Sequence, residues 1–296
     1  MKILNFGSLN LDHVYQVPHF VSAGETLSSL GYQVHLGGKG FNQSVALSNA
    51  GARVYHAGCV GADGAVCKAY LEAHDVNTAY ISTLDTPTGH AVIQVEESGQ
   101  NCILLYGGAN QCVTPTHIDG VLSHFGGGDH ILLQNEISNV AYLIAQAKKR
   151  GMTVVLNPSP ISEGLLRLPF SDVDWLLLNE VEGAALCGCA NTKKMPALLQ
   201  SRFPACSIVL TLGEAGAVCR RAGEEWAVPA CRVKAVDTTA AGDTFTGYFL
   251  CGLMEGLSIP EAMRLASAAA AIAVTQRGAA DSIPSRPAVQ AMLCAK

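Results

Sequence analysis

The chain is poor in charged residues. Of its 296 residues only 15% are Asp, Glu, Lys or Arg, and the formal net charge is −5 at pH 7. Binding to nucleic acid or to an anionic membrane needs a basic face, which this balance of charges does not supply. An apolar fraction of 49% excludes a disordered chain and is typical of a well-packed enzyme. We expect small-molecule ligands, with neither nucleic acid nor membrane as partner.

Long apolar segments are also missing. The most apolar later run, 266–274, is interrupted by Ser267 and has about half the length that spans a bilayer, so we expect a buried helix. The N-terminal run, 1–7, lacks the basic flank, the longer apolar region and the cleavage site of a secretory signal. The sequence therefore predicts a cytoplasmic location.

Metal-binding and disulfide patterns are absent as well. The 11 cysteines and nine histidines are scattered, without a C-x-x-C pair, and Cys187 and Cys189 have no partners at zinc-finger spacing. We expect no structural metal site, and thiols that act mostly as small buried hydrophobes in a reducing compartment.

Strand-like apolar runs alternate with helix-like stretches along much of the chain. This alternation predicts one α/β domain, 1–296, with a doubly wound, mostly parallel sheet between helices and with ligands at the carboxyl ends of the strands. The expected strands are 3–7, 53–59, 131–134, 153–156, 175–178 and 207–211, and the expected helices include 42–49, 65–73 and 140–149.

Two segments interrupt this rhythm. Residues 11–36 and 89–106 resemble antiparallel strands, the second with a turn around 97–100. We expect them to form a small sheet that covers the ligand site as a lid. The alternative is that they extend an edge of the main sheet.

A carboxylate sits at the start of a helix in Asp-Thr-Thr-Ala-Ala-Gly-Asp, 237–243. The following Phe245, Phe249, Leu253 and Leu257 recur every four residues, as on one face of a helix. The first turn of a helix has unpaired amides and a positive dipole end, so it favours a developing negative charge. We interpret Asp243 as a proton acceptor beside a phosphoryl group. The alternative is an ordinary N-cap.

A second helix follows closely. Ser258-Ile259-Pro260-Glu261 is typical of a capping box with proline at the first helical position. Helices over 243–256 and 260–274 would then pack together and make the loop before Asp243 rigid.

A glycine-rich segment, Gly-Gly-Lys-Gly-Phe-Asn at 37–42, precedes another expected helix. It is neither a Walker loop nor a dinucleotide fingerprint. Asn42 offers both a donor and an acceptor, which suits a sugar. Asn10 and Asp12 follow the first strand, where a carboxylate can accept hydrogen bonds from a polyol. A plain turn remains the alternative for both segments.

Together these segments resemble the ribokinase-like (PfkB) family of carbohydrate kinases, nearly end to end, from 7–12 to Gly278 and Ser282. Two family signatures occur in the right order, at 37–46 and 237–243. The resemblance implies a ribokinase-like fold and an ATP-dependent kinase that phosphorylates a primary hydroxyl of a free pentose, ribose first, with Mg²⁺ and a K⁺ activator.

The resemblance also implies roles for individual residues. Asp243 would be the base, with an anion hole at Ala240, Ala241 and Gly242. Sugar contacts would come from Asn10, Asp12, Gly38, Lys39, Asn42 and Glu136. The nucleotide and magnesium would be contacted by Asn179, Glu182, Thr211, Gly213, Gly216, Gly242 and Ser267. The monovalent cation would lie among Asp237, Thr239, Ala273, Gln276, Gly278 and Ser282.

Two positions depart from the family pattern. Ser267 stands where a larger polar residue is usual near the adenine, and Tyr248 replaces a small residue at the end of the second signature. The nearest alternative function is a nucleoside kinase, for which Tyr15, Phe20, Tyr32 and Tyr106 are candidate stacking residues. Deoxyribose or a hexose as substrate, and a non-catalytic sugar sensor, are further alternatives. Because a lid sheet has unpaired edges, we also expect a homodimer formed through the lid.

Overall fold

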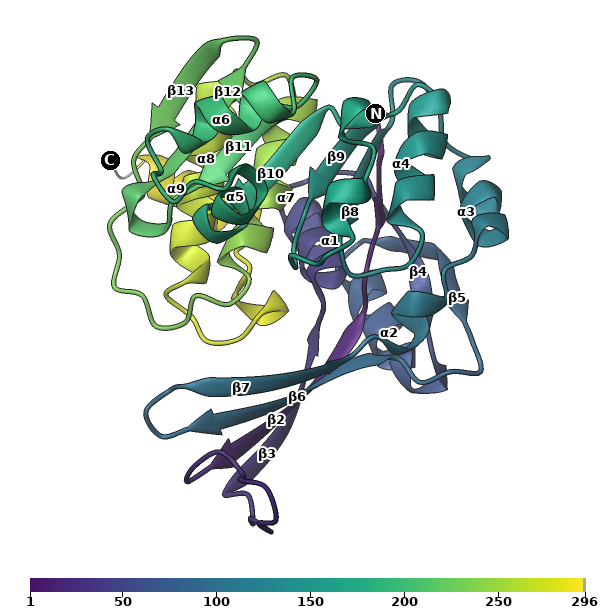
Figure 1. Ribbon diagram of the computed structural model, residues 1–296, viewed down its shortest axis with the longest axis vertical. Coiled ribbons are helices and arrows are strands. Elements are labelled where there is room, and N and C mark those ends of the chain that lie inside the picture. Colours follow the sequence, from purple (N-terminus) through teal and green to yellow (C-terminus); the bar gives the residue numbers. More distant parts are fainter. Residues whose placement is uncertain (295–296) are drawn as a thin grey trace.

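Nine strands form the larger of two sheets in the computed structural model, which describes residues 1–294 (Figure 1). Their order is β13-β12-β11-β10-β9-β8-β1-β4-β5, and the seven strands from β11 to β5 run parallel. The predicted parallel sheet is therefore confirmed. The bounds are β1 (Ile3–Phe6), β4 (Val54–Val60), β5 (Asn77–Thr83), β8 (His130–Gln134), β9 (Thr153–Asn157), β10 (Trp175–Asn179), β11 (Ser207–Thr211), β12 (Ala217–Arg221) and β13 (Glu224–Val228).

Helices cover both faces of this sheet. One face packs against α1 (Lys39–Asn49), α2 (Ala65–Ala73), α7 (Ala241–Met254), α8 (Ile259–Ala273) and α9 (Arg286–Cys294). The other packs against α3 (Pro115–Leu122), α4 (Val140–Lys149), α5 (Glu180–Cys187) and α6 (Met195–Arg202). A strand between two helical layers must be apolar on both sides. In β8, Leu132 joins one hydrophobic core and its neighbours Ile131 and Leu133 join the other.

The second sheet has the order β3-β2-β6-β7 and projects away from the main body (Figure 1). It consists of β2 (Asn10–Val17), β3 (Gly31–Gly37), β6 (Gly89–Glu96) and β7 (Asn101–Tyr106). The interpretation of 11–36 and 89–106 as an extension of the main sheet is thus wrong. The hairpins β2–β3 and β6–β7 are antiparallel as predicted, but the central strands β2 and β6 pair in parallel. We call these four strands the small sheet.

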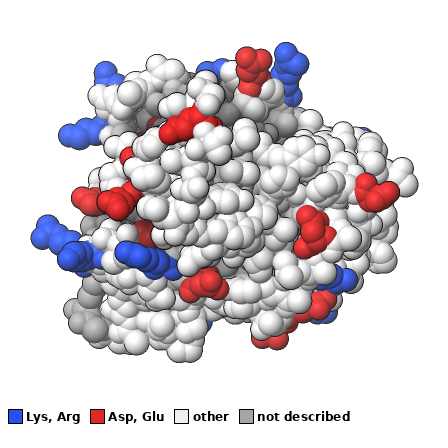
Figure 2. Space-filling model, turned by 90° about the horizontal axis from the view of Figure 1, so that it is seen from below, with Lys and Arg blue, Asp and Glu red and all other residues white. Residues whose placement is uncertain are grey.

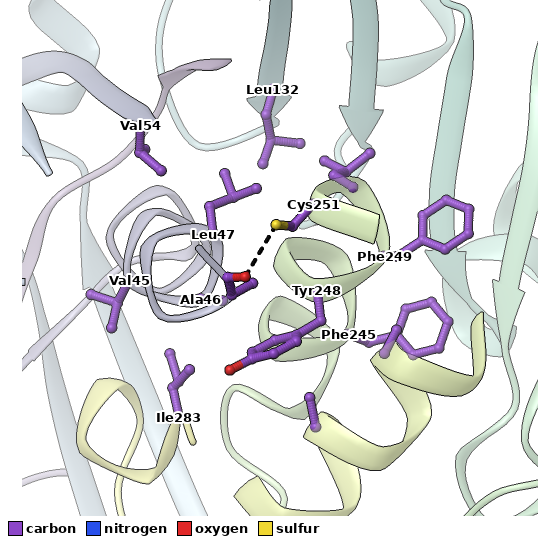
Figure 3. Close-up of a cluster of buried hydrophobic side chains, with 14 of the residues drawn as sticks. Val45, Ala46, Leu47, Val54, Leu132, Phe245, Tyr248, Phe249, Cys251 and Ile283 are labelled. Atoms are coloured by element: carbon purple, nitrogen blue, oxygen red, sulfur yellow. Dashed lines mark hydrogen bonds between the residues drawn. The ribbon is translucent and has the colours of Figure 1, made fainter. Parts of the chain in front are cut away.

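The helices that back the Asp243 loop begin slightly earlier than predicted, at Ala241 and Ile259 instead of 243 and 260. The capping box between Ser258 and Glu261 is confirmed. Helix α7 lies directly on α1, and a side chain at Gly247 would come within 2.5 Å of the Ala46 Cβ atom (Figure 3). Glycine at this position therefore sets how closely the two helices approach.

Tyr248, the departure from the second signature, is fully buried beside this contact (Figure 3). Its hydroxyl donates a hydrogen bond to the main-chain oxygen of Pro284 at 2.7 Å. The larger side chain is therefore accommodated, and it ties α7 to the chain segment that precedes α9.

The 11 cysteines are all free. Only five are buried, so the expectation of mostly buried thiols holds for fewer than half: Cys59, Cys67, Cys206, Cys219 and Cys251. Within residues 1–294, no three His, Cys, Asp or Glu side chains group as ligands for a metal ion. Among the helices in the same range, none combines the length and the apolar character that a bilayer crossing demands.

Candidate active site

Asp243 is the third residue of α7, and its side chain does not cap the helix. The N-cap is Ala240, so the alternative interpretation of Asp243 as an ordinary cap is wrong. Instead the carboxylate accepts hydrogen bonds from α1, from Asn42 Nδ2 at 3.1 Å and Gln43 Nε2 at 2.8 Å. It is only 7% exposed. The two sequence signatures, 200 residues apart, thus meet at this carboxylate.

The loop before Asp243 is built to expose main-chain donors. Ala240 adopts a left-handed conformation with φ 58°, a strained state that concentrates at functional sites. This turn aims the first amides of α7 at a cavity of about 190 Å³. The Ala241 amide contacts the Thr238 oxygen at 3.3 Å, whereas the amides of Gly242 and Asp243 have no acceptor in the part of the chain that the structure describes.

Two further carboxyl groups, Asp12 and Glu136, lie near Asp243 and come from different parts of the chain. Glu136, which follows β8, accepts hydrogen bonds from the Lys39 amide at 2.9 Å and from the Ser8 hydroxyl. Asp12 projects from β2 beside Gly37, where a Cβ atom would lie 2.1 Å from its Oδ2. Burial, and then the neighbouring Glu136 carboxylate, raise the pKa of Asp12 to about 6. Such a half-buried carboxyl group can accept hydrogen bonds from sugar hydroxyls when ionised.

Lys39 lies between the acidic groups. Desolvation works against its charge, but Asp243, Glu136 and Glu182 together outweigh that effect and raise the pKa of Lys39 above its ordinary value. Burial raises the pKa of Glu136, although the hydrogen bond from Ser8 and the charge of Lys39 oppose the shift. The Lys39 ammonium group therefore stays protonated among several carboxyl groups.

Asn10 is held by a residue that sequence reasoning missed. Asn110 donates to the Asn10 Oδ1 atom at 2.8 Å, and it also bonds the main chain of Leu9. The signal that could have found it is Gly107-Gly108-Ala109-Asn110, a glycine pair followed by a polar residue directly after the small sheet. Asn110 orients Asn10 at the base of β2.

A second, larger cavity of about 600 Å³ adjoins the first across Thr238, Gly242 and Phe245. Its volume falls in the range of sites for drug-sized ligands. Its walls bring together four predicted nucleotide contacts from distant segments: Thr211, Gly213, Gly216 and Ser267. The small side chains of α8 at Ser267, Ala270 and Ala271 leave this cavity wide.

Asn179 and Glu182 line the smaller cavity, where α5 begins. They form a capping box: Asn179 Oδ1 accepts from the Glu182 amide at 2.9 Å, and Glu182 Oε2 accepts from the Asn179 amide at 3.0 Å. Glu182 is 7% exposed, so its carboxylate is fixed and faces the cavity.

The residues predicted to hold a monovalent cation lie in the loop before α7 and in the segment that runs from the last residue of α8 to Ser282. The Asp237 carboxylate joins them, because it accepts from the Thr239 amide at 2.9 Å and from the Gly278 amide at 3.0 Å. Desolvation opposes its charge, but the donors of Thr239 and Gly278 lower the pKa of Asp237. The amide of Gln276 bonds the Ala273 oxygen at 3.1 Å, and Ser282 is buried in the following turn.

Comparisons with known proteins identify the family of the chain. Residues 1–286 match the model of the pfkB family of carbohydrate kinases. The chain is 39% identical to a ribokinase of Haemophilus influenzae, with 95% of this chain and 94% of the relative covered. It resembles a ribokinase of Cryptococcus neoformans var. grubii in complex with ADP, with 34% identity, a TM-score of 0.86, and 98% and 99% of the two chains covered.

A ribokinase of Arabidopsis thaliana complexed with ribose and ATP is 29% identical, with a TM-score of 0.90 over 99% of this chain and 98% of the other. The fold, with its large mostly parallel sheet and its small sheet, is thus shared with these ribokinases. The chain belongs to the pfkB family of carbohydrate kinases.

Proposed function

We propose that the protein is an ATP-dependent kinase that phosphorylates the primary hydroxyl of free ribose and forms ribose 5-phosphate. One observation carries this proposal: the Asp243 carboxylate and the free amides of Gly242 and Asp243 converge on one cavity. The family match and the relatives named above support it.

In this mechanism Asp243 accepts the proton of the primary hydroxyl while the hydroxyl oxygen attacks the γ-phosphorus. The bond from phosphorus to the bridging oxygen breaks, and ADP leaves. The amides of the α7 first turn stabilise charge on the transferring group, with Ala240 setting their direction. Most of the rate enhancement of such a reaction comes from positioning and charge neutralisation.

Recognition of the sugar would involve a buried acceptor that lacks a donor among the described residues. Asn42 Oδ1 is buried and has no hydrogen-bond donor among the described residues, although Asn42 Nδ2 is held by Asp243. A buried acceptor without a donor is unfavourable. A sugar hydroxyl would supply the missing donor, with Asn10, Asp12, Gly38, Lys39 and Glu136 as the other contacts.

The nucleotide would occupy the larger cavity, with Thr211, Gly213, Gly216 and Ser267 along its walls and its phosphates at Gly242. Mg²⁺ would neutralise charge on the phosphate oxygens. Asn179 and Glu182 would hold it, which fits a fixed, buried carboxylate on the wall of the phosphate cavity. K⁺ would lie near Asp237, Thr239, Ala273, Gln276, Gly278 and Ser282, where the Asp237 carboxylate joins the two loops.

The small sheet argues against a nucleoside kinase. Side chains alternate between the two faces of a strand, so Tyr15 lies on the opposite face from Asp12. Tyr32 packs on Tyr15 with ring centroids 4.9 Å apart, and Tyr106 packs on His90 at 5.0 Å. All three rings therefore lie on the face away from Asp12, where they cannot stack on a base in the site.

The small sheet would act as the lid, and two copies of the protein would pair through it as a homodimer in the cytoplasm. Its outer strand β7 is exposed at every residue, and Ile103, Leu104 and Leu105 are each more than half exposed. The face seen from this end of the molecule carries few charged side chains near its centre (Figure 2). Unpaired apolar edges of this kind are covered in most stable proteins.

A panel of free sugars and nucleosides with ATP, Mg²⁺ and K⁺, scored by ADP release, tests the proposed function. We expect ribose to give the highest kcat/KM, deoxyribose and hexoses less, and adenosine none above background. A chain that binds ribose without releasing ADP would be a sugar sensor, and the proposal would be wrong.

Replacement of K⁺ tests the cation site separately. We expect activity with ribose to rise when K⁺ replaces Na⁺ at constant ionic strength. Equal activity in the two salts would rule out the cation site and leave the kinase proposal standing. Variant Asp237→Asn should lose the difference between the salts.

A further inference from the structure

A chain of buried amide side chains runs beneath the catalytic carboxylate. It links β1, β8 and α1: Gln134 Nε2 donates to Asn5 Oδ1 at 2.9 Å and to Gln43 Oε1 at 2.6 Å. Gln43 in turn donates to Asp243. Asn5, Gln43 and Gln134 are at most 1% exposed. Burying so many amides is unfavourable unless each is paired, so an arrangement of this kind calls for a reason.

The orientation of the first amide is set by the main chain. Asn5 Nδ2 donates to the carbonyl oxygen of Gly40 at 2.6 Å, and a carbonyl oxygen can only accept. The Asn5 Oδ1 atom must therefore face Gln134. It follows that Gln134 presents its NH₂ group to both Asn5 and Gln43, and that Gln43 presents its oxygen to Gln134.

A second main-chain group sets the same orientation independently. Asn157 Nδ2 donates to the carbonyl oxygen of Leu177 at 2.9 Å, which leaves Asn157 Oδ1 facing Gln43. The Gln43 Nε2 atom donates to that oxygen at 3.1 Å and to Asp243 Oδ1 at 2.8 Å. Both N–H groups of Gln43 are thus assigned, and its amide cannot flip without losing several buried hydrogen bonds.

We propose that Gln43 is a positioning residue for the catalytic base. Its Nε2 group donates a hydrogen bond to Oδ1 of Asp243. The main-chain carbonyl groups of Gly40 and Leu177 fix the orientation of that donor, because they orient Asn5 and Asn157. Gln134 and Asn157 therefore act on Asp243 through Gln43. The result is a carboxylate that is held in one orientation before the sugar arrives. This inference rests on the proposed function, because it assigns Asp243 as the base.

Other charged groups around Asp243 come from other elements: Lys39 of α1, Glu136 after β8, Glu182 of α5 and, beyond Glu136, Asp12 of β2. A neutral variant at Gln43 therefore alters the hydrogen bond to the carboxylate and leaves the number of charges in the site unchanged, whereas Gln43→Glu adds one carboxylate.

The test compares Gln43→Met, which has a similar size and no donor, with Gln43→Glu, which replaces the donor by a second carboxylate. For Gln43→Met we expect kcat with ribose and ATP to fall roughly ten- to hundredfold while the KM for ribose stays within about threefold. The acidic limb of the pH–kcat profile should move to higher pH, because donors to a carboxylate favour its ionised form. Gln43→Glu should move that limb further.

The matched control is Gln200→Met in α6. Gln200 is less buried than Gln43, and it also donates from its side chain, but to the main-chain oxygen of Cys206, on the face of the main sheet opposite α1 and α7. Its kcat and pH profile should match those of the wild type. A folded Gln43→Met with the kcat and acidic limb of the wild type would overturn the inference.

Two further results keep the test decisive. If Gln43→Met does not fold, as judged by the absence of a cooperative thermal transition, Gln134→Met removes the donor that orients Gln43 and should change kcat and the acidic limb in the same direction. No change there would equally overturn the inference. A wild-type protein that does not phosphorylate ribose would instead refute the proposed function.

Discussion

The two sheets of this protein differ in how completely they are covered. The central strands of the main sheet, such as β8, are buried on both faces, whereas every residue of β7 in the small sheet is exposed. The proposed base, Asp243, lies against the covered sheet, where helices α1 and α7 hold it. The proposed sugar contact Asp12 lies on the exposed sheet. Packed helices thus surround the proposed base, whereas the proposed sugar contact lies on the sheet that is more open to solvent.

The largest effect on activity should follow from a change beside the covered main sheet, at Asp243. Asp243→Asn removes the proton acceptor and keeps the shape of the side chain, so we expect kcat to fall by about 10²–10⁴ with little change in the KM for ribose. Steady-state ADP release measures both values. The exposed Asp85→Asn is the control, and it should behave as the wild type. Near-normal turnover in Asp243→Asn would show that the base lies elsewhere.

Changing Asp12 in the small sheet should affect the binding of ribose and not the chemical step. Loss of its carboxylate in Asp12→Asn should lower kcat/KM for ribose about 10- to 100-fold, mostly through KM, because hydrogen bonds to a charged group contribute about 1.5–3 kcal/mol. Isothermal titration with ribose checks the affinity. A fall in kcat without a change in affinity would contradict the division between the two sheets.

The same variant makes a prediction about stability. Because the pKa of Asp12 is about 6 in the folded protein and 3.8 is its ordinary value, the folded form binds more protons between these pH values. Its contribution to stability is therefore lost as pH rises from about 4 to 6. Asp12→Asn should be more stable than the wild type at pH 8, on the order of 1 kcal/mol, and this gain should vanish near pH 4. Denaturant titrations at the two pH values measure it.

Separating helices α1 and α7, which cover the main sheet, should lower both stability and kcat by a moderate amount. Gly247→Ala places a methyl group 2.5 Å from the Ala46 Cβ atom and must push α7 away from α1, which lengthens the contacts of Asp243 with Asn42 and Gln43. We expect about 1–3 kcal/mol of destabilisation together with a lower kcat. Gly120→Ala in α3, where a Cβ atom meets nothing within 4 Å, should be neutral or slightly stabilising. Equal behaviour of the two variants would contradict the importance of the helix contact.

The smallest change in the folded chain should come from charging the exposed sheet. The double variant Leu104→Lys and Leu105→Lys places one lysine on each face of β7, so either face is disrupted if it pairs with a second copy. We expect the wild type to be a dimer and the variant a monomer by light scattering, with similar melting temperatures. The exposed Val181→Lys in α5 is the control. A monomeric wild type would refute pairing through the small sheet.

Much of the fold could be predicted from the sequence because it depends on local patterns. Apolar runs of strand length between amphipathic stretches predicted six of the seven parallel strands, and a capping box predicted the start of α8. The parallel strand β5 was missed, because polar residues alternate with its apolar ones. The antiparallel strands β12 and β13 at one end of the main sheet were also missed, since their polar residues, such as Arg220 and Glu225, hide the strand pattern. The parallel pairing of β2 with β6 was also missed, because the partners of a strand depend on distant segments.

By itself, the sequence determined which chemistry this protein can carry: a carboxylate at a helix N-terminus and a glycine-rich segment with amide side chains, as in the pfkB family. Only the tertiary structure decided which of these groups act together. Spacing along the chain does not show that Asn110 orients Asn10, or that Gln43 and Asn42 reach Asp243 from α1. Such contacts depend on where α1 and α7 cross, and that crossing is set by the packing of Gly247 against Ala46 and not by any local pattern.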